Sequence, residues 1–356
     1  MNIHEFYINR CIQLAKNGLG NTYPNPFVGC IIVHDDKVIG EGYTSPAGGN
    51  HAEVNAIESV SDKSLLKEST LYVSLEPCSH FGKTPPCSDL IIRYGIPRVV
   101  IGSTDSNELV SGKGIARLRA AGCEVMTGIL ENVCDWSHRR FFTFHRKRRP
   151  YVILKWAQSQ DGFLAPLIRE EKKPVWLSSP ASRQLVHKWR SEEQAILVGA
   201  QTVIDDDPGL TTRDWNGSNP MRVIIDPNAR IPLSSKIFHD QVKTIWVVRE
   251  QEMNQRIANH ELSVLKVPGD KDILETIMDL LYQESIQSLI VEGGSKTLQR
   301  FSDQNLWDEA RIFRSETIIK DGVKAPVIHG ELKEEKHYDR DLYQLYLNKN
   351  NTPPVI

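Results

Sequence analysis

The sequence predicts an α/β protein built from two domains. Its 356 residues exceed the ~100–200 residues typical of one domain. Short apolar strand-like runs alternate with segments of helical spacing along the chain, which indicates helix-flanked sheets with right-handed crossovers. Pro150 closes a basic and aromatic stretch and is a natural boundary. We therefore expect one domain over residues 1–147 and a second over residues 150–356.

The composition is that of an ordinary globular protein, with 40% hydrophobic and 25% charged residues. A net charge of −2 implies no general attraction to nucleic acid or anionic lipid. The first residues lack the apolar stretch of a signal peptide, and no apolar run approaches the ~20 residues that span a bilayer. We expect a cytoplasmic protein whose six cysteines serve metal binding or the core. Four of them lack metal-like neighbours and are expected to be incidental thiols: Cys11, Cys30, Cys123 and Cys134.

The first half predicts an alternating series of strands and helices. Strands are expected at residues 28–33, 38–43, 70–75, 98–102 and 124–127. Helices are expected at residues 3–17, 88–94 and 114–121. Asn50 is a suitable N-cap, which places His51 and Glu53 in the first turn of a further helix. A strand end and two helix starts can then bring His51, Cys78 and Cys87 to one point.

These three residues are a plausible ligand set for one zinc ion (Zn²⁺) per chain. Catalytic zinc sites keep three protein ligands and leave the fourth position to water, which ionises near pH 7. Glu53 is not needed as a ligand, so its carboxylate can pass a proton from water to a leaving amine. The pattern predicts hydrolytic deamination of an amidine-like carbon. The alternative is a closed structural zinc site with His80 as fourth ligand, and we favour the catalytic site.

The H-A-E motif at residues 51–53, together with Pro77–Cys78, resembles the cytidine-deaminase-like zinc deaminases. The usual C-x-x-C spacing is absent, because eight residues separate Cys78 from Cys87. The stretch from Glu76 to Cys87 is similar to the pyrimidine deaminase of bacterial riboflavin biosynthesis, and so are residues 24–29 and 51–56. In that family a reductase domain follows the deaminase. The resemblance implies a cytidine-deaminase-like three-layer fold for the first domain.

Residues 138–150 mix basic and aromatic side chains. One interpretation is a nucleic-acid surface with stacking aromatics. The other is a helix end whose phenylalanines dock on a domain and whose cations are solvated, since cations suit a helix C-terminus. We favour the helix end, because one short run in a nearly neutral chain is weak evidence. We accordingly expect neither nucleic-acid nor membrane partners.

The second half alternates again, without a second H-x-E or P-C motif. Strands are expected at residues 151–156, 195–198, 222–225, 244–248, 288–291 and 310–313. Helices are expected at residues 182–192, 271–284 and 296–301. Ser179–Pro180 is suited to the N-cap and first position of the first of these helices. The polar tail from about Lys333 carries no recognisable site.

Two stretches of the second half invite a functional interpretation. Gly293–Gly294 stands between a strand and a helix, where free amides can bind an anion, although a tight turn is equally consistent. The stretch matches neither G-x-G-x-x-G nor a P-loop. The carboxylates at residues 205–207 suit either a cation site or a solvated turn before Pro208, and we favour the turn. Arg190 and Arg213 are candidates for a sugar phosphate, because a guanidinium matches phosphate geometry.

Six pieces of the second half come in the order seen in the reductase domain of the riboflavin family: residues 154–157, 161–162, 176, 179–180, 202–213 and 292–294. That domain resembles dihydrofolate reductase in its α/β fold and uses NADPH. The resemblance implies that the cofactor lies near Ala157, Trp176, Thr202, Asp206, Gly294, Ser295, Lys296 and Thr297. It implies that a ribose-phosphate substrate lies near Arg190, Leu210, Arg213 and Glu292. The chain departs from the family at Gln160, at Pro174 and in the charged loop 169–173.

We therefore expect a bifunctional enzyme of riboflavin synthesis that binds small-molecule substrates and forms a homo-oligomer. The first domain would remove an amino group from a diaminopyrimidinone ribosylamino phosphate, with Glu53 as the catalytic residue. The second would reduce the ribosyl group of the product with NADPH. Two rival hypotheses are a tRNA or nucleotide deaminase with an accessory domain and a non-catalytic regulator with structural zinc.

Overall fold

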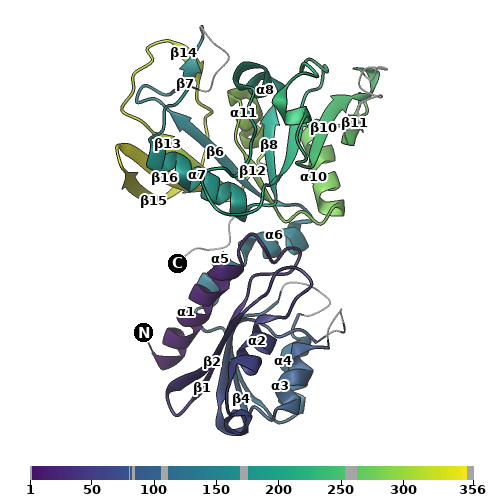
Figure 1. Cartoon of the computed structure of the whole chain (residues 1–356), viewed down its shortest axis with the longest axis vertical. Helices are drawn as coiled ribbons and strands as arrows, with labels where there is room; N and C mark the ends of the chain where they lie inside the picture. The colour runs from purple at the N-terminus through teal and green to yellow at the C-terminus, as the bar shows by residue number, and fades with distance from the viewer. Residues whose placement is uncertain are drawn as a thin grey trace. The chain divides into compact units, whose positions relative to one another are not determined.

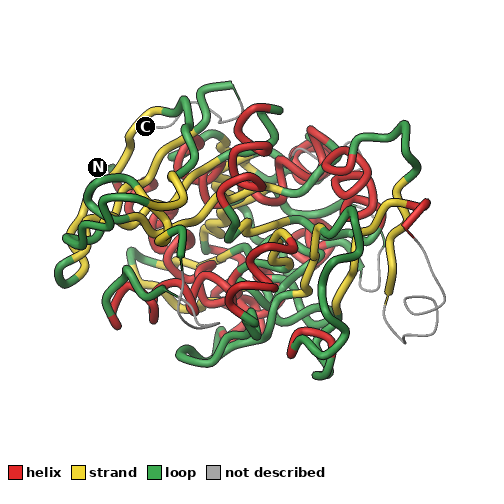
Figure 2. Tube along the Cα trace, turned by 90° about the horizontal axis from the view of Figure 1, so that it is seen from above, coloured by secondary structure: helices red, strands yellow, loops and turns green. Residues whose placement is uncertain are grey.

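The computed structural model describes residues 2–79, 81, 85–105, 111–168, 175–252 and 263–350. Contacts between residues divide the chain after Arg148 into two compact units, and each is described by itself. Figure 1 labels their elements, and Figure 2 marks helices in red and strands in yellow along the same trace. Pro174 and the charged loop 169–173 lie outside the described residues, as does His80.

The first unit is built around a sheet with the strand order β2-β1-β3-β4-β5 among its described residues. Strand β1 runs antiparallel to β2 and β3, and the following strands run parallel. Its elements are α1 (Ile3–Ala15), η1 (Lys16–Gly18), β1 (Gly29–His34), β2 (Lys37–Tyr43), α2 (Ala52–Ser59), η2 (Lys63–Glu68), β3 (Thr70–Leu75), α3 (Cys87–Arg93), β4 (Arg98–Ser103), α4 (Lys113–Ala120), β5 (Glu124–Thr127), α5 (Glu131–Ser137) and α6 (Arg139–Lys147).

Helices cover both faces of this sheet, because successive strand residues point to opposite sides. Ile31 and Val33 pack with α1 and with Cys134 of α5 on one face. Cys30 and Ile32 pack with α2, α3 and α4 on the other. Figure 1 shows α1 on one side of the strands and α2 to α4 on the other. The first unit is therefore a three-layer α/β/α fold.

Two predictions for the first unit have different outcomes. Helix α2 begins one residue later than expected, with His51 rather than Asn50 at the N-cap, so the Asn50 prediction is wrong. The His51 side chain makes no capping bond and is left free for another role. The helix expected around Phe142 is confirmed, because α6 buries Phe141, Phe142 and Phe144. These rings lie in the interior and are not available for stacking on bases.

The second unit contains a larger sheet with the order β11-β10-β9-β8-β12-β6-β13-β16-β15 in the described part of the chain. Strands from β11 to β13 in this order run parallel, and β16 and β15 add antiparallel pairs. Its elements are β6 (Tyr151–Gln158), β7 (Phe163–Pro166), α7 (Pro180–Glu192), β8 (Ala195–Gly199), α8 (Ala200–Asp206), β9 (Met221–Ile225), η3 (Lys236–Phe238), β10 (Thr244–Arg249), η4 (Glu250–Glu252), β11 (Ser263–Val267), α10 (Ile273–Gln283), β12 (Ser288–Val291), α11 (Ser295–Asp303), β13 (Glu309–Arg314), β14 (Gly322–Lys324), β15 (Glu331–Tyr338) and β16 (Asp341–Leu347). Strand β14 pairs with β7 outside the large sheet.

Helices also cover both faces of the large sheet. Helices α10 and α11 pack on the face that carries Val152 and Leu154. Helices α7 and α8 pack on the opposite face, with Tyr151 and Ile153. The Ser179 side chain accepts the Ser182 N–H and Pro180 opens α7, as predicted. The alternating pattern of the sequence thus becomes a mostly parallel sheet with helices on both sides.

Two segments of the second unit differ from expectation. The favoured turn at residues 205–207 is wrong for its first part, because Asp205 and Asp206 end helix α8. The polar tail forms the hairpin β15–β16, whose inner strand buries Tyr343 and Leu347. Sequence reasoning missed both, since a seven-residue helix and a charged edge strand carry little periodic signal.

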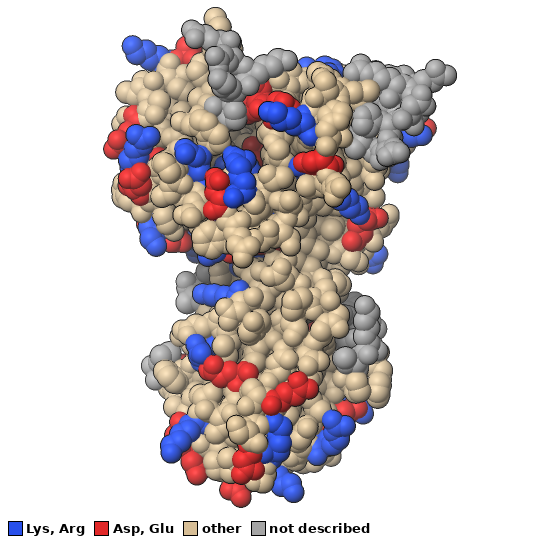
Figure 3. All heavy atoms as spheres, in the orientation of Figure 1, with Lys and Arg blue, Asp and Glu red and all other residues tan. Residues whose placement is uncertain are grey.

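No helix in the described ranges is long and apolar enough to cross a membrane. On the face drawn in Figure 3, acidic and basic side chains are interspersed over each unit.

Candidate functional sites

His51, Cys78 and Cys87 come together in the first unit from three separate elements. His51 is the N-cap of α2, Cys78 follows the end of β3, and Cys87 is the first residue of α3. The His51 Nδ1 atom lies 3.6 Å from the Cys78 sulfur and 3.3 Å from the Cys87 sulfur. A search of the described residues for three or more His, Cys, Asp or Glu side chains close enough to hold one metal ion finds these three.

The distances between these donor atoms fit zinc. Bond lengths of about 2.3 Å to sulfur and about 2.0 Å to nitrogen, at a tetrahedral angle, place sulfur and nitrogen roughly 3.5 Å apart. Both observed separations lie close to that value. Two sulfurs and one imidazole nitrogen are also a donor set that zinc prefers. The three side chains therefore fit a zinc site with one position left for water.

The surroundings of Cys78 in this cluster favour its thiolate form. Hydrogen bonds from Cys87 and His51 lower the pKa of Cys78 to about 4, although burial opposes them. The hydrogen bond to Cys78 likewise raises the pKa of His51 to about 9, against the effect of burial. The backbone N–H of Cys87 also donates to the Cys78 sulfur at 3.3 Å. Cys78 is therefore prepared as an anionic ligand, since the thiolate is the metal-binding form.

Glu53 lies on the first turn of α2, beside this cluster, and is only 4% exposed. Burial raises the pKa of its carboxyl group to about 7, although the nearby His51 cation acts in the opposite direction. A carboxyl group with a pKa near neutrality can both accept and donate a proton under physiological conditions. The structure therefore places Glu53 where the sequence expects a proton carrier.

Glu76 belongs to the stretch that resembles the deaminase family, but the sequence analysis assigned it no role. Its buried carboxylate accepts backbone N–H groups from Gly114 at 2.9 Å and Ile115 at 3.2 Å, at the start of α4. It also accepts from Asp105 at 3.2 Å and Gly112 at 2.9 Å. The bonds tie the segment that leads into Cys78 to α4 and to the end of β4. The available signal was an acidic residue directly after an apolar strand.

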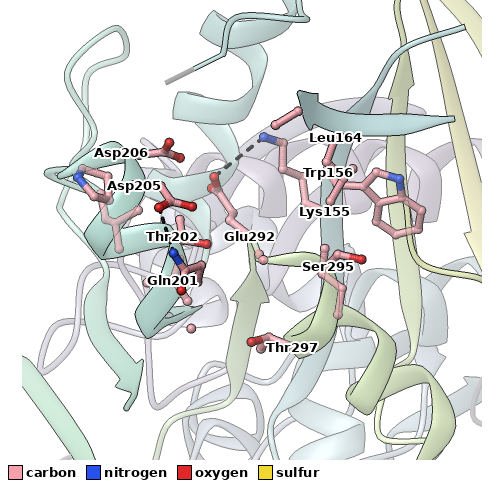
Figure 4. A pocket seen from close by; sticks show the side chains of 18 of the residues that line it. Lys155, Trp156, Leu164, Gln201, Thr202, Asp205, Asp206, Glu292, Ser295 and Thr297 are labelled. Carbon is pink, nitrogen blue, oxygen red and sulfur yellow. Dashed lines mark hydrogen bonds and ion pairs between the residues drawn. The ribbon is translucent and has the colours of Figure 1, made fainter. Parts of the chain in front are cut away.

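The second unit contains a cavity of about 1060 Å³ at the carboxyl ends of its parallel strands. Ligands of open α/β sheets bind at this edge. Figure 4 shows side chains from β6, α8 and the start of α11 around it. All twelve residues predicted for the cofactor and the substrate line this cavity: Ala157, Trp176, Arg190, Thr202, Asp206, Leu210, Arg213, Glu292, Gly294, Ser295, Lys296 and Thr297.

Arg190 and Glu292 form a bidentate ion pair in the cavity wall. The Arg190 Nε and Nη2 atoms donate to the two Glu292 oxygens at 2.8 and 2.7 Å, and Nη1 donates to the Thr211 carbonyl at 3.1 Å. Burial raises the Glu292 pKa, but Arg190 and Lys155 together bring it down to about 2. The forked edge of Arg190 is therefore occupied by Glu292.

Lys155 is a cavity residue that sequence reasoning missed as a site residue. Its ammonium group lies 3.7 Å from Glu292, as the dashed line in Figure 4 marks. Burial lowers its pKa, and Glu292 partly offsets the effect. The signal was available in the sequence, because Lys155 is the one charged residue in strand β6.

The Gly293–Gly294 turn brings the starts of α8 and α11 into close approach. A Cβ atom at Gly199 would lie 2.5 Å from the Thr297 hydroxyl oxygen, and one at Gly294 would lie 3.4 Å from that of Thr202. Gly293 has φ +134°, in the region that L side chains rarely adopt. The glycines therefore let two threonine hydroxyls and the first amides of α11 face the same part of the cavity.

Comparisons with known proteins cover both units. Residues 1–103 match the family described as "Cytidine and deoxycytidylate deaminase zinc-binding region", and residues 150–336 match the "RibD C-terminal domain". The chain is 41% identical over 324 residues to riboflavin biosynthesis protein RibD of Aquifex aeolicus, covering 90% of this chain and 89% of the relative. It is 36% identical to that of Escherichia coli, covering 87% and 86%.

Solved structures agree with these relatives. A diaminohydroxyphosphoribosylaminopyrimidine deaminase/5-amino-6-(5-phosphoribosylamino)uracil reductase of Thermotoga maritima is 35% identical with a TM-score of 0.83, over 97% of this chain and 98% of that one. RibD of Acinetobacter baumannii is 31% identical with a TM-score of 0.86 and the same coverage. The predicted fold class, a cytidine-deaminase-like domain followed by a dihydrofolate-reductase-like domain, is confirmed. The chain belongs to the RibD family of riboflavin biosynthesis proteins, bifunctional enzymes that join a zinc-dependent deaminase to an NADPH-dependent reductase.

Proposed function

We propose that the chain carries out two consecutive steps of riboflavin biosynthesis. A deaminase domain over residues 1–147 converts 2,5-diamino-6-(5-phosphoribosylamino)pyrimidin-4-one to 5-amino-6-(5-phosphoribosylamino)uracil. A reductase domain over residues 150–356 then reduces the ribosyl group of that product to ribityl with NADPH. The observation that carries the proposal is the buried Glu53 beside the compact cluster of His51, Cys78 and Cys87.

In the deaminase, His51, Cys78 and Cys87 hold the zinc ion. Zinc in such a site supplies a Lewis acid that makes water nucleophilic near neutral pH. Water adds to the pyrimidine carbon that bears the 2-amino group, the bond from that carbon to nitrogen breaks, and ammonia leaves. Glu53 takes a proton from the attacking water and gives it to the departing nitrogen. Its pKa of about 7 supports both steps, because neither protonation state is costly.

In the reductase, the protein positions two ligands, since the hydride chemistry belongs to the cofactor. We assign the nicotinamide half of NADPH to the region of Ala157 and Trp176, and its diphosphate to the first amides of α11. Ser295, Lys296 and Thr297 lie in that first turn, and Thr202 and Asp206 lie across from it on α8. The positive end of the helix dipole suits a diphosphate.

The substrate occupies the part of the cavity around the Arg190–Glu292 pair. Arg213 is assigned to its phosphate, with Leu210 forming an apolar wall. Glu292 stays ionised and keeps Lys155 and Arg190 in place. The buried ammonium group of Lys155 can hold or release a proton at the sugar while the cofactor delivers hydride, since burial lowers its pKa.

The test supplies the diaminopyrimidinone phosphate with and without NADPH and identifies both products. We expect ammonia and the uracil derivative without NADPH, and the ribityl product with it. Glu53→Gln should abolish ammonia release while zinc and reduction of the supplied uracil derivative persist. Glu58→Gln, an exposed position on the same helix, is the matched control. Full deamination by Glu53→Gln would refute the role of Glu53.

We further propose that the enzyme is cytoplasmic and homo-oligomeric. The six cysteines are all unpaired as thiols, which suits a reducing compartment. Strand β15 ends the order of the large sheet within the described residues, and an open edge can pair with another chain. Light scattering coupled to size-exclusion chromatography checks the assembly, and a monomer at all concentrations would refute it.

A further inference from the structure

Arg230 lines the reductase cavity, and no role has been assigned to it above. It lines the cavity together with Pro227 and Asn228, in the turn that follows strand β9. The structure assigns to this guanidinium the recognition of a phosphate monoester, the 2′-phosphate of NADPH. The inference rests on the proposed reductase function and deepens it, because it names the residue that selects NADPH over NADH.

The turn that carries Arg230 is held in place from the interior. Asp226 is fully buried, and its carboxylate accepts the backbone N–H of Arg230 at 3.0 Å and that of Ile231 at 2.9 Å. The Trp246 indole N–H donates to the same carboxylate at 3.3 Å. The backbone at Arg230 is therefore fixed, while its side chain is exposed at the cavity. A fixed base with a free guanidinium suits ligand recognition, because little ordering remains to be done on binding.

Four of the other cations that line the cavity are already paired with carboxylates, and Arg213 and Lys296 are assigned above to the substrate phosphate and to the start of α11. Arg190 and Lys155 contact Glu292. Lys236 lies 3.4 Å from Asp207, and Arg300 lies 2.5 Å from Asp272.

Arg230 differs from them, because the side-chain hydrogen bond recorded for its guanidinium goes to the neutral amide of Gln201, at 3.3 Å. No ion pair is found for Arg230 among the described residues. A guanidinium with most of its five donors available matches a phosphate bidentately.

The position of Arg230 relative to the diphosphate subsite distinguishes the cofactor from the substrate. Gln201 precedes Thr202, whose hydroxyl faces the Gly294 position at the start of α11. Figure 4 shows Gln201, Thr202 and Asp205 together at one side of the cavity. In NADPH the 2′-phosphate sits on the ribose next to the diphosphate. Arg230 is therefore close to where that ribose must lie.

Acidic neighbours sharpen the expected selectivity. Asp205 accepts from Gln201 at 2.8 Å, and Asp206 and Asp207 also line this side of the cavity. Asp207 is paired with Lys236, but without Arg230 the other carboxylates on this side would repel a doubly charged phosphate. Loss of Arg230 should therefore weaken NADPH more than NADH, which has a hydroxyl group at the same position.

The test measures binding to the full chain by calorimetry, with adenosine 2′,5′-bisphosphate and 5′-AMP as probes. We expect the bisphosphate to bind more tightly. Arg230→Gln should weaken the bisphosphate by about 10- to 100-fold, as for a lost charge-assisted hydrogen bond, and leave 5′-AMP unchanged. Arg230→Lys should keep part of the preference. Lys243→Gln removes the same charge at a position paired with Glu284 outside the cavity and should change neither affinity.

Three outcomes would overturn the assignment. The preference for the bisphosphate could survive Arg230→Gln, or it could be lost in Lys236→Gln instead. Alternatively, Arg230→Gln could raise the KM of the ribosylamino substrate and leave that of NADPH unchanged, which would assign Arg230 to the substrate phosphate. Because the binding assay needs no turnover, an enzyme that fails to oxidise NADPH would contradict the proposed function without deciding this inference.

Discussion

The carboxylate of Glu76 accepts the backbone N–H of Gly114 at 2.9 Å, across 38 residues of chain. Helix α4 approaches so closely here that a Cβ atom at Gly114 would lie 2.1 Å from the Pro77 carbonyl oxygen. Pro77 directly precedes the ligand Cys78. The start of α4 therefore supports the segment that presents a zinc ligand.

Glu76→Gln should weaken zinc retention and deamination together. An amide has one acceptor oxygen and places donors against backbone N–H groups, so we expect a loss of about 2 kcal/mol or more in the unfolding of the first unit. The zinc content after dialysis against a chelator and the rate of ammonia release measure the effect. Reduction of the supplied uracil derivative should persist, and Glu124→Gln on β5 is a control. Unchanged zinc affinity would contradict this support role.

Cys87→Ser should remove the metal from the purified protein. Wild-type protein is expected to carry about one zinc per chain, and the serine hydroxyl is a poor ligand because it is not ionised at neutral pH. Metal analysis by mass spectrometry reads the result directly. Cys123→Ser alters a half-buried thiol of the same unit outside the cluster and should keep the zinc. An active, metal-free enzyme would disprove the site.

Glu292→Gln should destabilise the second unit, because it leaves the buried Arg190 without its carboxylate. Breaking one side of a buried pair costs about 3–5 kcal/mol. Urea unfolding followed by tryptophan fluorescence is suitable, since only Trp136 of the seven tryptophans precedes Arg149. The pKa of Glu292 is lowered in the folded protein. The stability that its carboxylate contributes is therefore present above about pH 4.5 and is lost as the pH falls through about 2. The difference between variant and wild type should shrink over that range.

His138 should make the first unit sensitive to acid. It is 1% exposed between Phe27 and Phe142, and neither ring nitrogen has a well-formed hydrogen bond within the described residues. Burial lowers its pKa to about 4, although the Ser74 backbone acts in the opposite direction. Because the unfolded chain then binds the proton more readily, this stability is present above pH 6.5 and lost as the pH falls towards 4.

The loss attributable to His138 amounts to about 3 kcal/mol. His138→Leu should flatten the dependence of the unfolding free energy of the first unit on pH between 6.5 and 4. Calorimetry of the unfolding transition of that unit measures this dependence. His337→Leu, on the exposed strand β15, should leave it unchanged. An identical slope in His138→Leu and the wild type would contradict the prediction.

The limits of sequence reasoning are visible at particular residues. Asn50 has the right chemistry for an N-cap, but His51 takes that position, and no local pattern distinguishes two adjacent residues that both can precede a helix. Asp205 and Asp206 looked like a turn before Pro208, yet they end a short helix that packs Val203 on the sheet. Tertiary packing decided the second case, because burial of Val203 outweighs the local preference for a turn.

The sequence by itself determined the alternating α/β fold and predicted three zinc ligands with Glu53. Those features depend on periodicity and on motif spacing, which are local properties of the chain. The residues that line the reductase cavity were implied by the resemblance to the riboflavin family. Only the tertiary structure decided that Arg190 is bound to Glu292, 102 residues away, and that Lys155 is buried beside them. It also decided that Glu76 ties the segment leading into Cys78 to the start of α4. Such pairs depend on which strands become neighbours in a sheet, and the order of strands is set by long-range packing that no short stretch of sequence records.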